Sequence, residues 1–224
     1  MHQLISKKII IYLFVFLILV SVNNNSFTKL TLPNINNIEI SGLDLENSDI
    51  IKRYINNSNF KNIFFIEKID IIKKINSLKI IESFSIFKNY PSTLKIEIKK
   101  TNFLARTKKG GSNYFIGSNG KLIEDNDSTS ILPFVFGNLD VQEFIKFKNE
   151  IDRTNFKYND ILSLYFYKSK RWDIKTSKGY LIKLPKNDIK KYLNMFVQLE
   201  KELMFEETTV IDFRPKNQII LNEK

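Results

Sequence analysis

Residues 90–98, which read YPSTLKIEI, decide the fold of the first half of this chain. From position 94 onward apolar and charged residues alternate, and the apolar ones are Leu94, Ile96 and Ile98. Because successive side chains of a strand point to opposite faces, this pattern predicts a strand with one dry and one wet face. Residues 80–87 alternate in the same way through Phe84 and Ile86, so the two segments are predicted to form a hairpin around Pro91.

A strand and two amphipathic helices are predicted before this hairpin. Residues 35–41 alternate as a strand, and Gly42 permits a sharp turn after it. Ser48 is a suitable N-cap for the first helix. The second helix carries an apolar stripe at helical spacing, formed by Ile69, Ile72, Ile75 and Leu78. We expect both helices to cover the dry face of the hairpin, in the order strand, helix, helix, strand, strand over residues 35–103.

Residues 104–224 predict a second, mixed α/β domain built on an antiparallel sheet, which makes the fold class α+β. Helices are expected over residues 141–152 and after a cap at Asn187 or Asp188, where apolar residues recur with helical period. Strands are expected at residues 114–116, 122–123, 132–137, 161–167, 172–176, 180–184, 209–213 and 218–221. A glycine-containing turn at residues 118–121 joins the first two of these strands.

The N-terminus carries one apolar run, residues 9–22, behind Lys7 and Lys8. At about 1.5 Å per helical residue this run spans roughly 21 Å, less than the roughly 30 Å hydrocarbon core of a bilayer. Its length therefore leaves open a cleaved signal peptide. The lack of an A-x-A-like cleavage site favours a retained single transmembrane helix over residues 9–26, with Ile9, Tyr12, Phe14, Leu17 and Val22 among the anchoring residues.

The basic residues before this run place residues 1–8 in the cytoplasm and the bulk of the chain across the membrane. Residues 27–34 are expected to be a linker. The expected organisation is thus a cytoplasmic tail, an anchor over residues 9–26, the linker, one domain over residues 35–103 and another over residues 104–224.

Composition excludes several classes of function. The chain has no cysteine, and its one histidine is His2, so thiolate chemistry, histidine zinc clusters and histidine-based triads are excluded. No phosphate-binding loop motif and no spacing of acidic residues with a nucleophile is present, and we expect no enzyme activity, no cofactor, no metal and no small-molecule substrate. The formal net charge is +11, but the lysines are interleaved with acids, whereas a nucleic-acid site needs a clustered basic patch. We therefore expect no nucleic-acid partner.

The first domain, with an I-x-G motif at residues 40–42 and the hairpin at residues 90–98, resembles a POTRA domain. Together with the anchor and the second domain, it resembles the FtsQ/DivIB family of bitopic cell-division proteins. The matching pieces are NIFFI at residues 62–66, YPSTL at 90–94, LAR at 104–106, NG at 119–120 and LP at 132–133, followed by RWDI at 171–174, GYLIKL at 179–184 and IDFR at 211–214. The chain departs from the family pattern at Lys100, Phe103 and Pro215, where an acid, a proline and an aromatic residue are usual.

The resemblance implies a non-catalytic scaffold in the inner membrane at the division septum, with its bulk in the periplasm. It implies FtsB-like and FtsL-like partners for the second domain, a link to septal peptidoglycan synthesis, and other division proteins as partners of the POTRA-like domain. Two other interpretations remain: a basic envelope protein that binds an acidic polymer or a phospholipid surface, and a POTRA chaperone module for outer-membrane assembly.

The candidate partner-binding residues lie near the C-terminus. Gln218, Ile219, Ile220 and Leu221 form an apolar last strand, which either pairs on both sides or offers an edge to another chain. Asp212 and Arg214 flank Phe213 and share one face, where they either form an ion pair that protects an edge or contact a partner. In the family, this end of the second domain receives FtsB in a complex with FtsL.

Residues Arg171 and Trp172 allow two interpretations as well. Tryptophan and arginine are enriched at binding hot spots. A tryptophan that opens a strand is more commonly a core residue, with the arginine stacked or solvated, and we favour that assignment.

Overall fold

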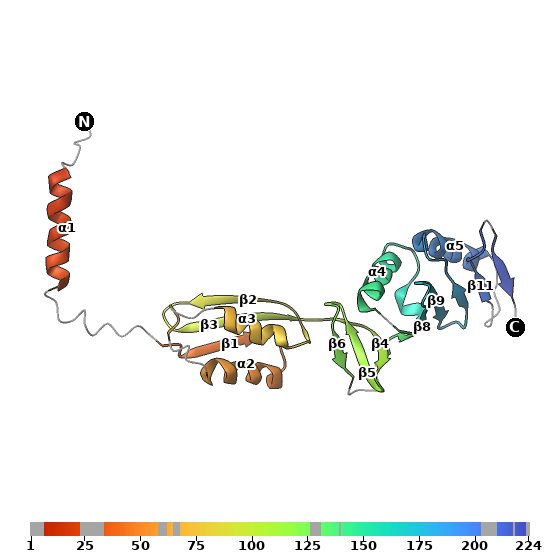
Figure 1. Cartoon of the computed structure of the whole chain (residues 1–224), viewed down its shortest axis with the longest axis horizontal. Coiled ribbons are helices and arrows are strands. Elements are labelled where there is room, and N and C mark those ends of the chain that lie inside the picture. Colours follow the sequence, from red (N-terminus) through yellow and green to blue (C-terminus); the bar gives the residue numbers. More distant parts are fainter. Residues whose placement is uncertain are drawn as a thin grey trace.

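The computed structural model describes residues 7–22, 34–57, 62–64, 68–125, 131–138, 140–202, 210–216 and 218–222. An N-terminal helix, α1 (Lys7–Val22), precedes two domains that are arranged end to end, each with its own sheet (Figure 1). The apolar side chains of α1 are exposed on all sides, from Ile9 to Val20. Among the described residues no helix combines the length and the apolar character needed to cross a membrane. Residues 23–26 of the expected anchor lie outside the described residues.

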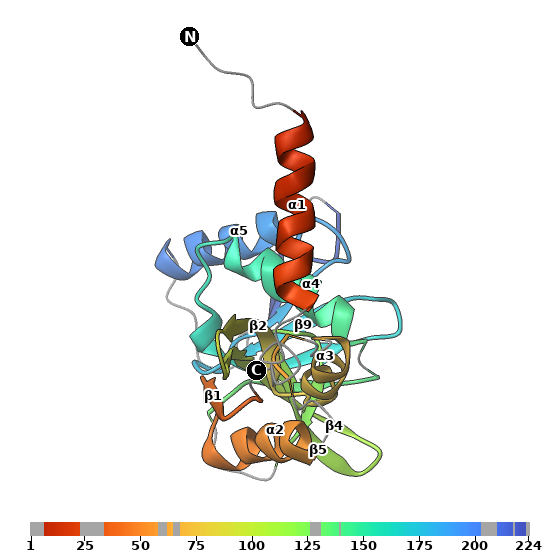
Figure 2. The same ribbon diagram turned by 90° about the vertical axis from the view of Figure 1, so that its left-hand side faces the viewer.

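The first domain has the expected order of strand, helix, helix, strand, strand. Its elements are β1 (Asn37–Ser41), α2 (Leu45–Asn57), α3 (Lys68–Ser77), β2 (Ile81–Asn89) and β3 (Thr93–Lys100). The central strand β3 pairs parallel with β1 and antiparallel with β2. Both helices lie beside this sheet in the end-on view of Figure 2. Their buried side chains meet the dry face of β3 in one core of Ile51, Ile55, Ile71, Ile75, Ile81, Leu94, Ile96 and Ile98.

Two details of the helices differ from expectation. Asp44, not Ser48, caps α2, because the Asp44 Oδ1 atom accepts a hydrogen bond of 2.9 Å from the backbone N–H of Asn47, and Ser48 is buried inside the helix. The expected stripe on α3 is also partly wrong. Ile69 is 58% exposed, and the residues that reach the core are Ile71 and Ile75, four positions apart on one helical face.

The second domain is built on one nine-stranded sheet. Its strands are β4 (Phe103–Lys109), β5 (Ser112–Gly117), β6 (Leu122–Glu124), β7 (Phe134–Phe136), β8 (Ile161–Phe166), β9 (Trp172–Thr176), β10 (Leu181–Lys183), β11 (Val210–Asp212) and β12 (Ile220–Asn222). The order across the sheet is β12-β11-β10-β9-β8-β7-β4-β5-β6. The helices are α4 (Val141–Asp152) and α5 (Ile189–Glu202), with a short 3-10 helix at Tyr158–Asp160.

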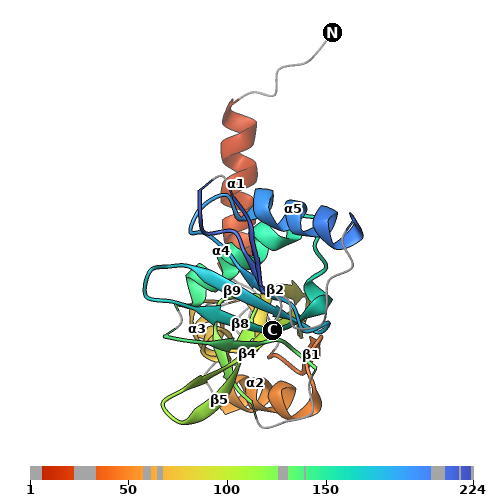
Figure 3. The same ribbon diagram turned by 90° about the vertical axis from the view of Figure 1, so that its right-hand side faces the viewer.

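The expectation of an antiparallel sheet is wrong for three strand pairs. The pairs β4–β7, β7–β8 and β10–β11 are parallel, while the others are antiparallel. Parallel neighbours need a crossover connection, which is usually a helix. Here α4 carries the chain from β7 to β8, and α5 carries it from β10 to β11. The two helices thereby lie on the same face of the sheet (Figure 3).

The core of the second domain lies between this face and the two helices. Val135, Leu164, Ile174, Ile182 and Ile211 pair in register across β7 to β11, and each is at most 1% exposed. Trp172 is 3% exposed and stacks on Phe147 of α4, with ring centroids 4.4 Å apart. The assignment of Trp172 to the core is confirmed, and Arg171 stacks on Tyr167 at 4.7 Å.

Candidate partner-binding edge

The strand β12 forms one edge of the large sheet. It pairs antiparallel with β11, and no strand among the described residues pairs with its other side. The strand begins at Ile220, two residues later than expected. Its residues Ile220 and Leu221 are 41% and 43% exposed, and before it Ile219 is 37% exposed and Gln218 is exposed as well. An apolar edge strand with unpaired backbone groups is a template for pairing with another chain. The sequence left open whether this last strand pairs on both sides or lies at the edge of the sheet. Among the described residues it lies at the edge.

The neighbouring strand β11 is buried and firmly packed. Val210 and Asp212 are 9% exposed, and Ile211 is not exposed at all. Phe213, which follows β11, is 1% exposed, and its ring centroid lies 5.5 Å from that of Tyr192 on α5. The side chain of Phe213 is therefore buried in the free chain, and its place among the candidate partner-binding residues stays a prediction. This side chain holds the end of β11 against α5.

Asp212 and Arg214 form an ion pair, one of the two roles that the sequence left open for them. The Arg214 Nε atom donates to Asp212 Oδ1 at 2.6 Å, Nη2 donates to Oδ2, and the backbone N–H of Arg214 donates to Oδ1 at 3.0 Å. Burial alone would raise the pKa of Asp212, but these hydrogen bonds outweigh it and hold the pKa below its ordinary value. The pair thus braces the chain where it leaves β11 for the connection to β12.

A row of side chains runs across the open face of the sheet and ends at this edge. The registers place Tyr165, Asp173, Lys183, Asp212 and Ile220 opposite one another on β8 to β12. Acid, lysine and acid alternate at its centre, as favourable cross-strand pairing requires. A strand added outside β12 would extend this row beside Ile220.

Asp173 is the most buried charge of the row, at 3% exposed. Burial raises its pKa above the ordinary value, although a hydrogen bond from Tyr167 and the nearby cation of Arg171 oppose that shift. Arg171 Nε and Asp173 Oδ1 lie 3.8 Å apart, and among the described residues neither atom has a hydrogen-bond partner. The row was not predicted from the sequence, because it depends on strand registers that local patterns do not reveal.

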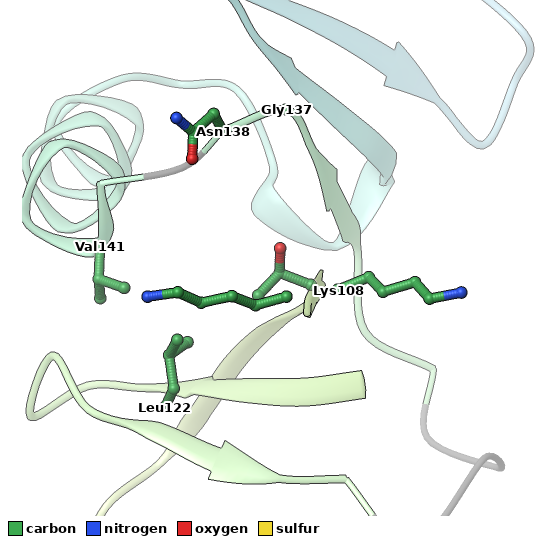
Figure 4. Close-up of a pocket in the computed structure, with 7 residues that line it drawn as sticks. Lys108, Leu122, Gly137, Asn138 and Val141 are labelled. Atoms are coloured by element: carbon green, nitrogen blue, oxygen red, sulfur yellow. The ribbon is translucent and has the colours of Figure 1, made fainter. Parts of the chain in front are cut away.

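One small cavity of the second domain offers no room for an organic substrate. It lies between β4, β6 and the start of α4, and it has a volume of about 40 Å³. Figure 4 shows Leu122 and Val141 on two sides of it, with one lysine side chain between them. Drug-sized ligands occupy about 300 Å³ or more, so this cavity holds only water-sized molecules. Within the described ranges, no three His, Cys, Asp or Glu side chains are grouped to hold a metal ion.

Comparison with known proteins gives matches along most of the chain. Residues 34–100 match the family model described as "POTRA domain, FtsQ-type", and residues 105–214 match the one described as "Cell division protein FtsQ/DivIB, C-terminal". No curated protein matches. One solved structure that matches is the major extracytoplasmic domain of the trans isomer of the cell-division protein DivIB from Geobacillus stearothermophilus. Its TM-score is 0.36 at 11% identity, over 47% of this chain and 96% of that chain.

Proposed function

Because this chain belongs to the FtsQ/DivIB family of cell-division proteins, we propose that it is a membrane-anchored scaffold that recruits other division proteins by direct binding. Members of the family are non-catalytic division proteins with protein partners in the division machinery. The finer proposal concerns which surface binds and what it binds. The observation that carries it is the exposed apolar edge of β12 beside the buried strand β11.

The proposed mechanism at this edge is strand addition. Main-chain hydrogen bonds supply affinity in such complexes, and alternate side chains supply specificity. The apolar contacts are Ile219, Ile220 and Leu221, and Gln218 lies just before them. Asp212, Arg214 and the buried Phe213 keep β11 and the chain that follows it in place. The proposed partner is an FtsB-like segment in a complex with an FtsL-like protein, which links this scaffold to septal peptidoglycan synthesis.

The proposed location is the inner membrane at the division septum, with the two domains in the periplasm. The apolar side chains all around α1, behind Lys7 and Lys8, support an anchoring role in contact with membrane lipid. We keep the organisation given by the sequence as part of this proposal: residues 1–8 in the cytoplasm, 9–26 as anchor, 27–34 as linker, 35–103 as the POTRA-like domain and 104–224 as the second domain.

The POTRA-like domain is proposed to bind other division proteins. Its strand β2 (Ile81–Asn89) is an edge of the small sheet and the longest strand of the chain's described part. It pairs with β3 on one side, so its other side offers backbone groups of the same kind as β12.

Capture of the FtsB-like and FtsL-like periplasmic segments by the full-length protein in detergent tests this function. The variant Ile220→Pro removes a backbone donor from the edge strand, whereas the matched variant Ile220→Thr keeps the donor and a β-branched side chain. We expect capture by the parent and by Ile220→Thr, and loss of capture by Ile220→Pro. Capture that Ile220→Pro leaves intact in a folded protein contradicts strand addition at β12.

Salt separates this function from the electrostatic alternative, which the net charge of +11 motivates. The Debye length falls from roughly 10 Å at 0.1 M salt to roughly 3 Å at 1 M, so binding through dispersed lysines is largely screened. Strand addition with apolar contacts is expected to persist over this range. Salt-sensitive capture by the parent and both variants alike would favour the envelope-surface interpretation.

A further inference from the structure

The two domains are joined by a connection of only two residues. Strand β3 ends at Lys100 and β4 begins at Phe103, so Thr101 and Asn102 are the only link in the covalent chain. Figure 1 shows β4, β5 and β6 directly beyond β3 along the long axis of the molecule. Domains within one chain move relative to each other unless an interface holds them. The contacts around this link therefore determine whether the molecule bends.

The turn between β5 and β6, residues 118–121, lies against this link and against the end of the first domain. We call these four residues the clasp. The Asn119 side chain is its centre: the Nδ2 atom donates to the backbone oxygens of Lys79 and Ile81, both at 2.9 Å. Its Oδ1 atom accepts from the backbone N–H of Lys121 at 3.0 Å. One amide therefore ties the turn to itself on one side and to the first domain on the other.

The link and the same end of the first domain are also bound by Ser118, Lys121 and the backbone of Asn119. The Ser118 Oγ atom donates to Glu82 Oε2 at 2.7 Å and accepts from the backbone N–H of Asn102 at 3.0 Å. The backbone N–H of Asn119 donates to Thr101 Oγ1 at 3.2 Å. A hydrogen bond of 3.3 Å joins Lys121 Nζ to the backbone oxygen of Asn76. Both residues of the link are thus held by the turn.

Close packing reinforces these hydrogen bonds. A Cβ atom on Gly117 would lie 2.6 Å from Asn119 Oδ1 and 2.7 Å from Thr101 Oγ1. A side chain at position 117 would therefore displace the side chains of Asn119 and Thr101. Gly120 has a φ of +72°, which a side chain disfavours, and its backbone N–H donates to the Gly117 oxygen at 2.9 Å. Glycine at both positions therefore favours the close fit of the turn against the link.

We propose that Asn119 is a positioning residue that locks the angle between the two domains, so that the molecule acts as a rigid spacer between its first domain and the β12 edge. The amide is suited to this role because it presents two donors to two carbonyl oxygens and one acceptor to an N–H group. A carboxylate has the same shape but offers no donor when ionised, and its oxygen would face the oxygens of Lys79 and Ile81. The inference concerns the joint alone and holds whichever partner binds the edge.

The distance between two spin labels, one on each domain, tests the lock. The chain has no cysteine, so labels are introduced with Asn56→Cys on α2 and Lys190→Cys on α5, both at exposed positions. In the full-length protein in detergent, double electron–electron resonance is expected to show one narrow distance distribution. Adding Asn119→Asp is expected to broaden or shift it, because the ties to the first domain are lost.

The control is Asn113→Asp, which makes the same chemical change at an exposed position of β5. It is expected to leave the distribution narrow and unmoved. Circular dichroism and the fluorescence of the buried Trp172 establish that each variant is folded. A narrow, unshifted distribution in folded Asn119→Asp would overturn the proposal, as would a broad distribution in the parent.

A second variant tests the packing without altering any polar group. Gly117→Ala crowds Asn119 and Thr101 and is expected to change the label distance in the same way as Asn119→Asp. If Asn119→Asp does not fold, the lock is tested by comparing the label distances of Gly117→Ala and the parent. An unchanged distribution in folded Gly117→Ala would then count against the lock.

Discussion

Replacing Phe213 by alanine tests whether the buried end of β11 supports the edge. The side chain is 1% exposed and packs against Tyr192 of α5, so its removal leaves a cavity between the sheet and the helix. Truncation of a buried phenylalanine costs about 3–5 kcal/mol of the free energy of unfolding. With a urea slope of about 2 kcal/mol per molar, the unfolding midpoint of the second domain falls by roughly 1.5–2.5 M.

Fluorescence follows this loss in one domain alone, because Trp172 is the only tryptophan and lies in the core of the second domain. Urea unfolding is therefore read at its emission maximum for the parent and the variant. The control is Phe136→Ala on β7, where the ring is 45% exposed and stacks on Tyr165, so a loss of about 1 kcal/mol is expected. The reasoning is refuted if Phe213→Ala destabilises the domain no more than Phe136→Ala does.

Three further outcomes follow from the described contacts. Asp212→Asn should cost about 1.5–3 kcal/mol at neutral pH. Because the folded state lowers the pKa of Asp212, the difference from the parent should begin to shrink as the pH falls through about 4, the ordinary pKa of the unfolded chain, and should be lost only below the lowered pKa of the folded state. A urea series from pH 7 down to pH 2 checks this, and a difference that stays constant over the series would contradict it. Asp44→Ala removes the cap of α2 and should cost about 1 kcal/mol of the free energy of unfolding, and the exposed ion pair of Asp44 with Lys100 adds little to this. Hydrogen exchange of the backbone amides in α2 measures the loss. Protection equal to the parent's would contradict the capping role. Gly42→Ala should destabilise the first domain far more than Gly110→Ala destabilises the second. An added Cβ would lie 1.7 Å from the Ile98 oxygen at position 42 and meets nothing within 4 Å at position 110. Thermal unfolding followed by circular dichroism compares the two variants with the parent.

Local periodicity predicts much of this fold because most elements bury one face only. The helix at Val141–Asp152 and the strand at Trp172–Thr176 are confirmed residue for residue. The errors occur where two local signals compete. Asp44 and Ser48 are both good caps, and the choice of Asp44 became visible only through its bonds to Asn47 and Lys100. Ile69 fits a helical stripe by spacing, but the direction of the stripe depends on where the sheet lies.

Strand direction is a second kind of error, and its cause lies in the connections. Alternation along a strand is the same whether the neighbour runs parallel or antiparallel. The helices α4 and α5 each stand between two strands that became neighbours, as a crossover connection requires. Both helices were predicted, so the parallel pairs β7–β8 and β10–β11 could have been inferred from the sequence. The parallel pair β4–β7 is joined through β5 and β6, and no helix between these strands indicates it.

Some features of the candidate site could be predicted from the local sequence, and others depend on contacts between distant segments. The apolar character of residues 219–221 was visible in the sequence, whereas their position at an edge depends on α5 placing β11 next to β10. The turn at residues 118–121 was predicted as a simple hairpin loop, and Asn119 fits that assignment through its bond to Lys121. Its two bonds to Lys79 and Ile81 span 40 and 38 positions of sequence, so no pattern around residue 119 encodes them. A residue whose local role is already satisfied thus acquires a second role from the domain that precedes it in the chain. If that second role is the lock proposed above, substitutions at Asn119 should separate the two, with aspartate preserving the turn through its acceptor while releasing the first domain.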